Sequence, residues 1–186
     1  MRYSLLLLCF TGLNAQQGSV NRLTLSGGWS RQTPAPAYEA AQTAATLGIS
    51  YGFRPWKHVE FEAGVFAGLQ PVPSVCNAHG CFDPDDRLIW VPFGIRFVAP
   101  LAAGRIELSA GGGGLYEAYS LTNEASNPFA LRSYSGWGGY FTGGAAVALD
   151  RSRHWWLGAT PRWFLANPHY RRDRWLQIAG EVSFRF

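Results

Sequence analysis

The sequence Trp-Leu-Gln-Ile-Ala-Gly-Glu-Val-Ser-Phe-Arg-Phe, from Trp175 to Phe186, alternates in polarity up to the last residue. One face of a strand over these residues would carry Leu176, Ile178, Gly180, Val182, Phe184 and Phe186. The other face would carry Gln177, Ala179, Glu181, Ser183 and Arg185. A closed sheet with lipid outside and water or ion pairs inside requires this alternation, and the terminal aromatic residue is typical of the last strand of a transmembrane β-barrel.

The beginning of the chain indicates export. Met1-Arg2-Tyr3-Ser4 carries one positive charge, and the apolar run that follows it is too short to span a bilayer as a helix. Leu13-Asn14-Ala15 offers a cleavage site, so we predict a signal peptide over residues 1–15 and a mature domain over residues 16–186. A disordered or membrane-anchoring N-terminus is the alternative.

The composition supports a single barrel domain. The chain has 186 residues, and 47% of them are hydrophobic, yet no stretch approaches twenty apolar residues. The apolar residues must therefore be distributed by alternation. The 22 glycines and 15% aromatic residues fit a barrel better than a helical bundle. The net charge of +4 is mild and scattered, which argues against nucleic acid as a partner.

Eight segments alternate with period two: 22–30, 43–54, 59–69, 88–99, 105–117, 136–149, 155–165 and 175–186. Their lengths suit tilted strands that cross hydrocarbon. Three short links (55–58, 100–104 and 150–154) alternate with four long ones (31–42, 70–87, 118–135 and 166–174). The sequence therefore predicts an all-β fold, an eight-stranded antiparallel up-and-down transmembrane β-barrel with short periplasmic turns and long extracellular loops.

Charged residues occupy the opposite phase of the predicted strands. They are Arg22, Arg54, Glu60, Glu62, Arg96, Arg105, Glu107, Arg162, Glu181 and Arg185. An arginine facing lipid near the bilayer midplane would cost roughly 2–4 kcal/mol, so we expect these side chains to face the lumen. The interior of an eight-stranded barrel is about wide enough for side chains to fill. We therefore predict a lumen filled by an Arg/Glu network. A water-soluble barrel would have the opposite polarity of faces.

Aromatic residues lie near the ends of the predicted strands, where they would form belts at the two membrane interfaces. The predicted outer belt contains Trp29, Trp90, Tyr116, Trp137, Trp163 and Trp175. The predicted periplasmic belt contains Phe53, Trp56, Phe97, Trp155 and Phe186.

With its terminal Phe186 and the alternating Ile178, Val182 and Phe184, the chain resembles the small eight-stranded outer-membrane barrels of the OmpA and OmpX type. The resemblance covers the mature chain, residues 16–186. It implies a monomer in the bacterial outer membrane, in contact with membrane lipid and lipopolysaccharide. It also implies that Phe184 and Phe186 form a signal for the barrel-assembly machinery.

Two cysteines remain after removal of the predicted signal peptide. Cys76 and Cys81 are an even pair in an exported chain, so we predict a disulfide between them. A metal site that includes His79 is the alternative, although the spacing matches no standard zinc pattern. We expect no cofactor.

The long links contain one candidate for catalysis and one for lipid binding. Some small barrels deacylate or acylate lipid A, which requires serine, histidine and an acid together. Arg171 stands two residues after His169, where the deacylase-like arrangement has serine, so we predict no enzyme. The paired N–H donors of an arginine guanidinium group can bind two oxygens of a lipopolysaccharide phosphate at once. The candidate contacts, which could also be ordinary solvated charges, are Arg87, Arg132, Arg171, Arg172 and Arg174.

The predicted function is a structural or surface-interaction role through the four long extracellular loops. Two alternatives remain open at this point. One is a lipid A-modifying enzyme in the same fold, and the other is a narrow channel gated by the Arg/Glu network.

Overall fold

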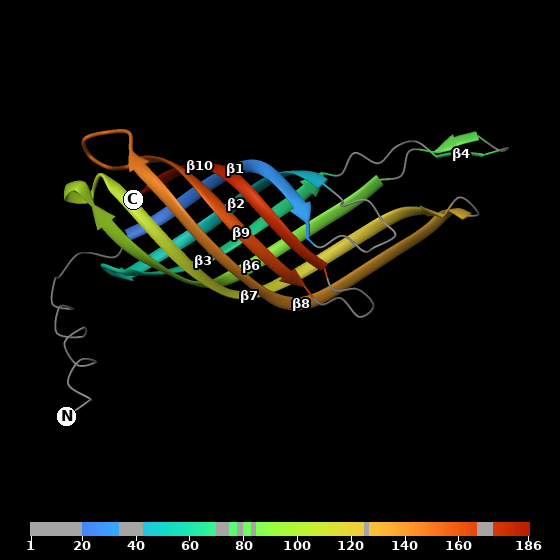
Figure 1. The fold of residues 1–186 in the computed structure, drawn as a ribbon, viewed down its shortest axis with the longest axis horizontal. Helices are drawn as coiled ribbons and strands as arrows, with labels where there is room; N and C mark the ends of the chain where they lie inside the picture. Colours follow the sequence, from blue (N-terminus) through green and yellow to red (C-terminus); the bar gives the residue numbers. More distant parts are fainter. Residues whose placement is uncertain are drawn as a thin grey trace, which may run out of the picture.

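The computed structural model describes residues 20–33, 43–69, 75–77, 80–82, 85–124, 127–166 and 173–186. Within these segments eight antiparallel strands close into a barrel in the order β1-β10-β9-β8-β7-β6-β3-β2 (Figure 1). The strands are β1 (Val20–Gln32), β2 (Thr43–Trp56), β3 (Val59–Leu69), β6 (Asp85–Leu101), β7 (Ile106–Glu124), β8 (Asn127–Ala148), β9 (Trp155–Ala166) and β10 (Asp173–Arg185). The predicted fold is confirmed. The predicted signal peptide lies outside the described residues.

Two smaller elements accompany the barrel. The short strands β4 (Val75–Asn77) and β5 (Gly80–Phe82) pair only with each other, and the 3-10 turn η1 (Ala102–Gly104) joins β6 to β7. In the described segments no helix is long and apolar enough to cross a bilayer.

The C-terminal strand closes the barrel against the first strand. β1 and β10 pair from Arg22 opposite Arg185 to Gln32 opposite Trp175. Beyond that ladder, the backbones of Asn21 and Phe186 exchange two hydrogen bonds of 3.0 Å. The wall therefore has no unpaired edge at the seam, which is how a barrel avoids exposing backbone groups.

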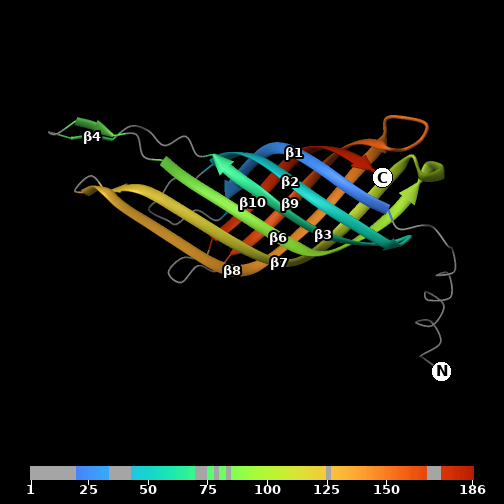
Figure 2. The same ribbon diagram turned by 180° about the vertical axis from the view of Figure 1, so that it is seen from behind.

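The three tight connections lie at one end of the barrel, where β1 begins and β10 ends (Figures 1 and 2). The β8–β9 turn is organised by Asp150, whose carboxylate accepts hydrogen bonds from the backbone N–H groups of His154 (3.2 Å) and Trp155 (2.9 Å) and from the Ser152 hydroxyl. These bonds lower the pKa of the Asp150 carboxyl to about 2, mainly through the Ser152 hydroxyl. The carboxylate is therefore a structural part of this turn.

The opposite end differs from the prediction. The segment predicted as a loop over 118–135 is mostly strand, because β7 and β8 continue as a hairpin as far as Glu124 opposite Asn127. The β8–β9 ladder stops earlier, at Gly138 opposite Ala166, so the hairpin projects past its neighbour (Figure 2). The predicted 70–87 link likewise contains β4, β5 and the start of β6. Serine, asparagine and proline are typical of loops, whereas cross-strand pairing extends the barrel sheet through the β7–β8 hairpin and pairs β4 with β5 as a separate small sheet.

The two faces of the wall have the predicted polarity. Leu25, Leu47 and Phe141 are exposed on the outside, Leu47 with 62% of its surface. Glu60 and Arg96 point inward and are only 1% and 2% exposed. A water-soluble barrel would reverse this arrangement, so the orientation of the side chains fits a barrel surrounded by lipid.

Two tryptophans of the predicted outer belt are inside the barrel instead. Trp90 and Trp175 are 0% and 2% exposed, whereas Trp29, Trp137 and Trp163 are exposed as predicted. Position near a strand end predicts the outer belt for this pair, but the phase of the alternation decides which face a residue occupies. The alternation of β6 places Trp90 on the inner face, and burial in the lumen follows from that phase.

Candidate functional site

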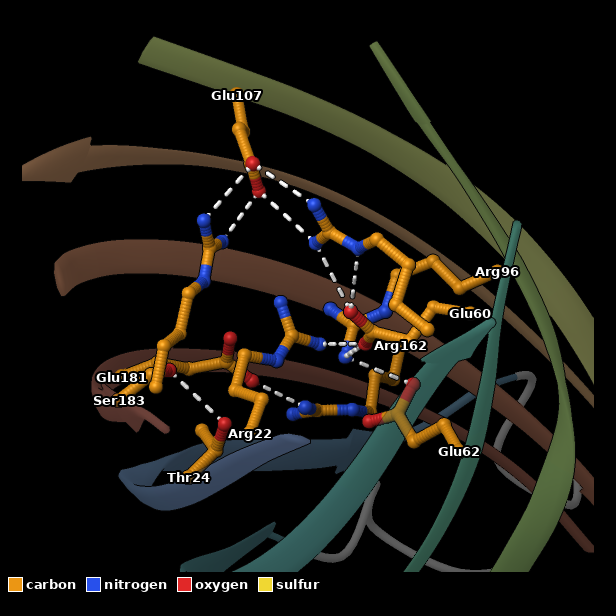
Figure 3. Close-up of polar contacts among 11 residues, drawn as sticks. Arg22, Thr24, Glu60, Glu62, Arg96, Glu107, Arg162, Glu181 and Ser183 are labelled. Carbon is orange, nitrogen blue, oxygen red and sulfur yellow. Dashed lines mark hydrogen bonds and ion pairs between the residues drawn. The ribbon is translucent and has the colours of Figure 1, made fainter. Parts of the chain in front are cut away.

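The lumen is filled by two layers of side chains. The layer toward the long-loop end is largely aromatic and contains Phe66, Leu88, Trp90, Leu115, Tyr140, Phe164, Ala166 and Trp175. The layer toward the short-turn end is charged and contains Arg22, Arg54, Glu60, Glu62, Arg96, Glu107, Arg162, Glu181 and Arg185 (Figure 3). Inward-facing residues from β1, β2, β3, β6, β7, β9 and β10 build the charged layer, which we call the lumen network.

Glu60 on β3 is the centre of the lumen network. Its carboxylate accepts hydrogen bonds from Arg22 on β1 and from Arg54 on β2, the latter at 2.9 Å. Arg96 on β6 forms a third ion pair with it at 3.4 Å, and Arg96 also pairs with Glu62 at 2.9 Å. One buried carboxylate therefore connects guanidinium groups from three different strands.

Glu107 on β7 forms the second junction. Arg54 donates to both carboxylate oxygens, at 3.0 and 3.2 Å. Arg185 on β10 donates to the same two oxygens, with Nη1 at 2.9 Å from Oε1. The Arg185 guanidinium also stacks 3.7 Å above the ring of Trp156. Arg185, Glu107, Arg54 and Glu60 thus form one continuous chain across the barrel.

Arg162 on β9 joins the charged layer to the aromatic one. It pairs with Glu181, donates to the amide oxygen of Gln177 at 3.1 Å, and lies 4.5 Å from the centre of the Phe66 ring. Gln177 in turn donates to the hydroxyl of Thr46 at 2.9 Å. Arg162 is therefore fixed by a charge, a neutral acceptor and an aromatic face together.

The aromatic layer is closely packed and contains one buried carboxylate. The Trp90 ring stacks on Phe164 with centroids 4.9 Å apart and meets Trp175 edge-on at 5.6 Å. The indole N–H of Trp90 donates to Glu117 at 2.8 Å. Sequence reasoning missed Trp90, Trp175 and Glu117 as lumen residues, although strict period-two counting places them on the inner face.

The structure brings together every predicted member of the network except Arg105. That residue is exposed in the turn after η1, and its backbone N–H bonds the carbonyl of Ala102 at 3.2 Å. β7 begins at Ile106, so the alternation that would point Arg105 inward does not yet apply to it.

The remaining predicted residues are only partly described by the structure. Arg174 is exposed at the start of β10, while Arg171, Arg172 and His169 fall outside the described residues, as do the side chains of Arg87 and Arg132. β4 and β5 place Cys76 opposite Cys81 in the backbone register. Directly paired residues in an antiparallel ladder have Cα separations that a disulfide can bridge, and the disulfide stays a prediction.

The outward-facing terminal aromatics pack against their neighbours. Phe184 is tilted against Trp155, with ring centroids 4.9 Å apart, and is stacked on Phe186 at 6.0 Å.

Among the described residues no group of three or more His, Cys, Asp or Glu could hold a metal ion. His79 lies outside those residues.

A cavity opens at the short-turn end, and we call it the vestibule. It has a volume of about 720 Å³ and is bordered by all three tight connections. Its floor is formed by Arg54, Glu107, Arg185 and Trp156, so the lumen network closes it from the rest of the lumen. Deeper inside, the described residues enclose a second cavity of about 10 Å³, close to the space of a single water molecule.

No protein-family model matches the sequence, and no curated protein matches it at the level of sequence. Solved structures do match the fold. Neisserial surface protein A aligns with a TM-score of 0.66 and 11% identity over 91% of this chain and 98% of its own. Ail, the attachment invasion locus protein of Yersinia pestis, crystallised with the heparin analogue sucrose octasulfate, aligns with a TM-score of 0.64 and 8% identity over 91% and 100%.

The outer-membrane protein OprG of Pseudomonas aeruginosa aligns with a TM-score of 0.60 and 14% identity, over 93% of this chain and 99% of OprG. At such low identities the similarity concerns the fold. This chain has the fold of the small eight-stranded outer-membrane barrels.

Proposed function

We propose that this protein resides in the bacterial outer membrane as a closed barrel and acts at the cell surface through its long-loop end. The observation that carries the proposal is the filled lumen. An aromatic layer and a charged layer follow one another along the barrel axis, and Trp90, Arg96 and Arg162 are almost fully buried in them. A lumen filled by described side chains in this way supports a role for the surfaces of the barrel rather than for its interior.

Export and assembly follow the same proposal. Residues 1–15 would be removed as a signal peptide, and Phe184 and Phe186 would be read by the barrel-assembly machinery. The outward position of both rings supports this role, because a recognition signal must be accessible before the barrel closes. The fold shared with outer-membrane proteins supports the location.

At the surface, we propose contact between lipopolysaccharide phosphates and the arginines Arg87, Arg132, Arg171, Arg172 and Arg174. Arginine binds phosphate through paired N–H donors, so several arginines at one rim would anchor the barrel in the outer leaflet. The Yersinia barrel crystallised with a sulfated sugar analogue, which is also a polyanion, and this favours an anionic glycan as the partner of this end.

Two measurements test the proposal. Planar bilayers that contain the purified barrel should show no steady current, and the variants Glu60→Gln and Arg96→Gln should not create one. Lipopolysaccharide binding should weaken in an Arg171→Gln/Arg172→Gln variant and persist in an Arg151→Gln control, which changes an exposed arginine at the opposite end. A steady current in the unmodified barrel would establish the channel alternative instead. Equal binding by the two variants would remove the arginine contact.

A further inference from the structure

The vestibule at the short-turn end has the size and the closed floor of a ligand site. Its volume of about 720 Å³ lies within the roughly 300–1,000 Å³ typical of small-molecule pockets. The ion-paired Arg54, Glu107 and Arg185 form the floor, so an entering molecule cannot pass further into the barrel. The vestibule is therefore a dead-end cavity that opens only toward the short turns.

The net charge of the vestibule is positive. Among the described residues Arg54, Lys57, Arg153 and Arg185 line it, against the carboxylate of Glu107 and the terminal carboxylate of Phe186. Both oxygens of Glu107 are already engaged by Arg54 and Arg185. The connected part of the lumen network, floor included, joins four arginines to three glutamates, so it carries one more positive than negative charge.

Two of the cations at the mouth are available to a ligand. Lys57 belongs to the β2–β3 turn and Arg153 to the β8–β9 turn, and both are exposed. No described carboxylate forms an ion pair with either of them. The Arg153 guanidinium reaches toward η1, where a Cβ placed on Gly104 would lie 2.9 Å from its Nη1 atom. The two turns thus present unpaired positive charge around the same opening.

An exposed apolar side chain lies beside this charge. Trp56 on β2 lines the vestibule and is 52% exposed. Trp156 on β9 also borders the vestibule but is only 1% exposed, since Arg185 stacks on its ring and its indole N–H donates to the carbonyl of Arg153 at 2.7 Å. An exposed indole next to cationic groups suits a ligand that has both a ring or short chain and a negative group.

We propose that the vestibule binds an amphiphilic anion, in which a phosphate or carboxylate group is joined to a ring or a short chain. The anionic group would lie near Lys57 and Arg153 at the mouth, and the apolar part would rest on the exposed ring of Trp56. The inference is independent of the surface role, because the vestibule and the long loops are at opposite ends of the barrel.

The test is a binding titration with the mature full-length barrel in a neutral detergent. The probe is 1-naphthyl phosphate, followed by the fluorescence anisotropy of its ring, and 1-naphthol is the uncharged comparison. The phosphate should bind, the naphthol should bind much more weakly, and added salt should reduce the binding of the phosphate because exposed charges are screened. Equal binding of the two probes would overturn the proposal.

Matched variants locate the site. Lys57→Gln/Arg153→Gln removes the two unpaired cations and should weaken binding of the phosphate about tenfold, since each exposed charge contributes a modest amount. Arg151→Gln changes an exposed arginine in the same turn that does not line the vestibule, and should bind normally. Both variants should keep the mobility shift of a folded barrel on unboiled gels. Unchanged binding by the folded double variant would refute the assignment.

A competition arm distinguishes the sources of the ligand. If micelles doped with phosphatidylglycerol displace the probe and phosphatidylcholine does not, the natural ligand is a lipid headgroup from the adjacent leaflet. If phosphatidylglycerol fails to compete while free phenyl phosphate does, the ligand is a soluble anion. If neither competes, the vestibule does not select the proposed chemistry and the proposal fails.

Discussion

Replacing Glu60 by Gln tests whether the lumen network depends on its central carboxylate. The substitution keeps the size of the side chain and one acceptor oxygen, but removes the charge that Arg22, Arg54 and Arg96 share. Breaking a buried ion pair typically costs about 3–5 kcal/mol, because it leaves an uncompensated buried charge. Arg54 retains Glu107 and Arg96 retains Glu62, so only Arg22 loses its ion-pair partner in the described network.

The expected loss of folding free energy is therefore near the lower limit, about 3 kcal/mol, or somewhat more than a hundredfold in the folding equilibrium. It would be measured by urea unfolding of the barrel in lipid vesicles, followed by tryptophan fluorescence and by the gel mobility of unboiled samples. Glu62→Gln should cost less, because Arg96 then keeps Glu60.

A second substitution sharpens the test. Adding Arg22→Met to Glu60→Gln removes the stranded charge and should restore part of the lost stability, since a buried pair replaced by apolar groups is often close to neutral. Arg105→Gln serves as the control and should change stability by less than about 0.5 kcal/mol, because Arg105 is exposed. If Glu60→Gln is as mild as that control, or if the added Arg22→Met causes further loss, the reasoning about the central carboxylate is wrong.

Three further outcomes are expected. The pKa of Asp150 lies below its ordinary value of 3.8, so the carboxylate should stabilise the β8–β9 turn fully above pH 3.8 and lose this effect as the pH falls toward about 2. Proteolysis of this turn should increase over the same pH range, and Asp150→Asn should abolish that pH dependence. Trp90→Phe should destabilise the barrel by about 1–3 kcal/mol in thermal unfolding, because Glu117 loses a buried donor. Gly94→Ala should reduce the yield of folded barrel on unboiled gels, since a Cβ would lie 2.3 Å from a backbone oxygen of the neighbouring strand.

Each of these has its own control. Trp137→Phe changes a tryptophan on the outer face and should have little effect on thermal unfolding. Gly27→Ala places a Cβ 3.6 Å from the Leu47 side chain, an ordinary contact, and should fold normally. A turn in Asp150→Asn that still loosens between pH 3.8 and 2 would show that another group is responsible. Equal folding of the two alanine variants would contradict the steric argument.

The fold was predictable because period-two polarity is a direct consequence of strand geometry. Residues such as Leu47 and Glu60 are sorted by phase alone, and the same phase locates Trp90 once proximity to strand ends is ignored. The period-two alternation does not predict the side-chain direction of a residue that precedes its strand, such as Arg105. It also does not predict which arginine pairs with which glutamate, since those partners depend on the stagger of strands around the barrel. The 118–135 hairpin was missed because its composition resembles that of a loop.

Closure between β1 and β10 joins the two ends of the chain, so it is the contact of greatest sequence separation in the wall. Until β1 and β10 pair, each strand has backbone N–H and C=O groups without hydrogen-bond partners, and hydrocarbon cannot provide such partners. We therefore expect insertion into lipid to be coupled to closure of the barrel. Removal of even the final few residues would disrupt the hydrogen bonds between Asn21 and Phe186 and leave an opening in the seam.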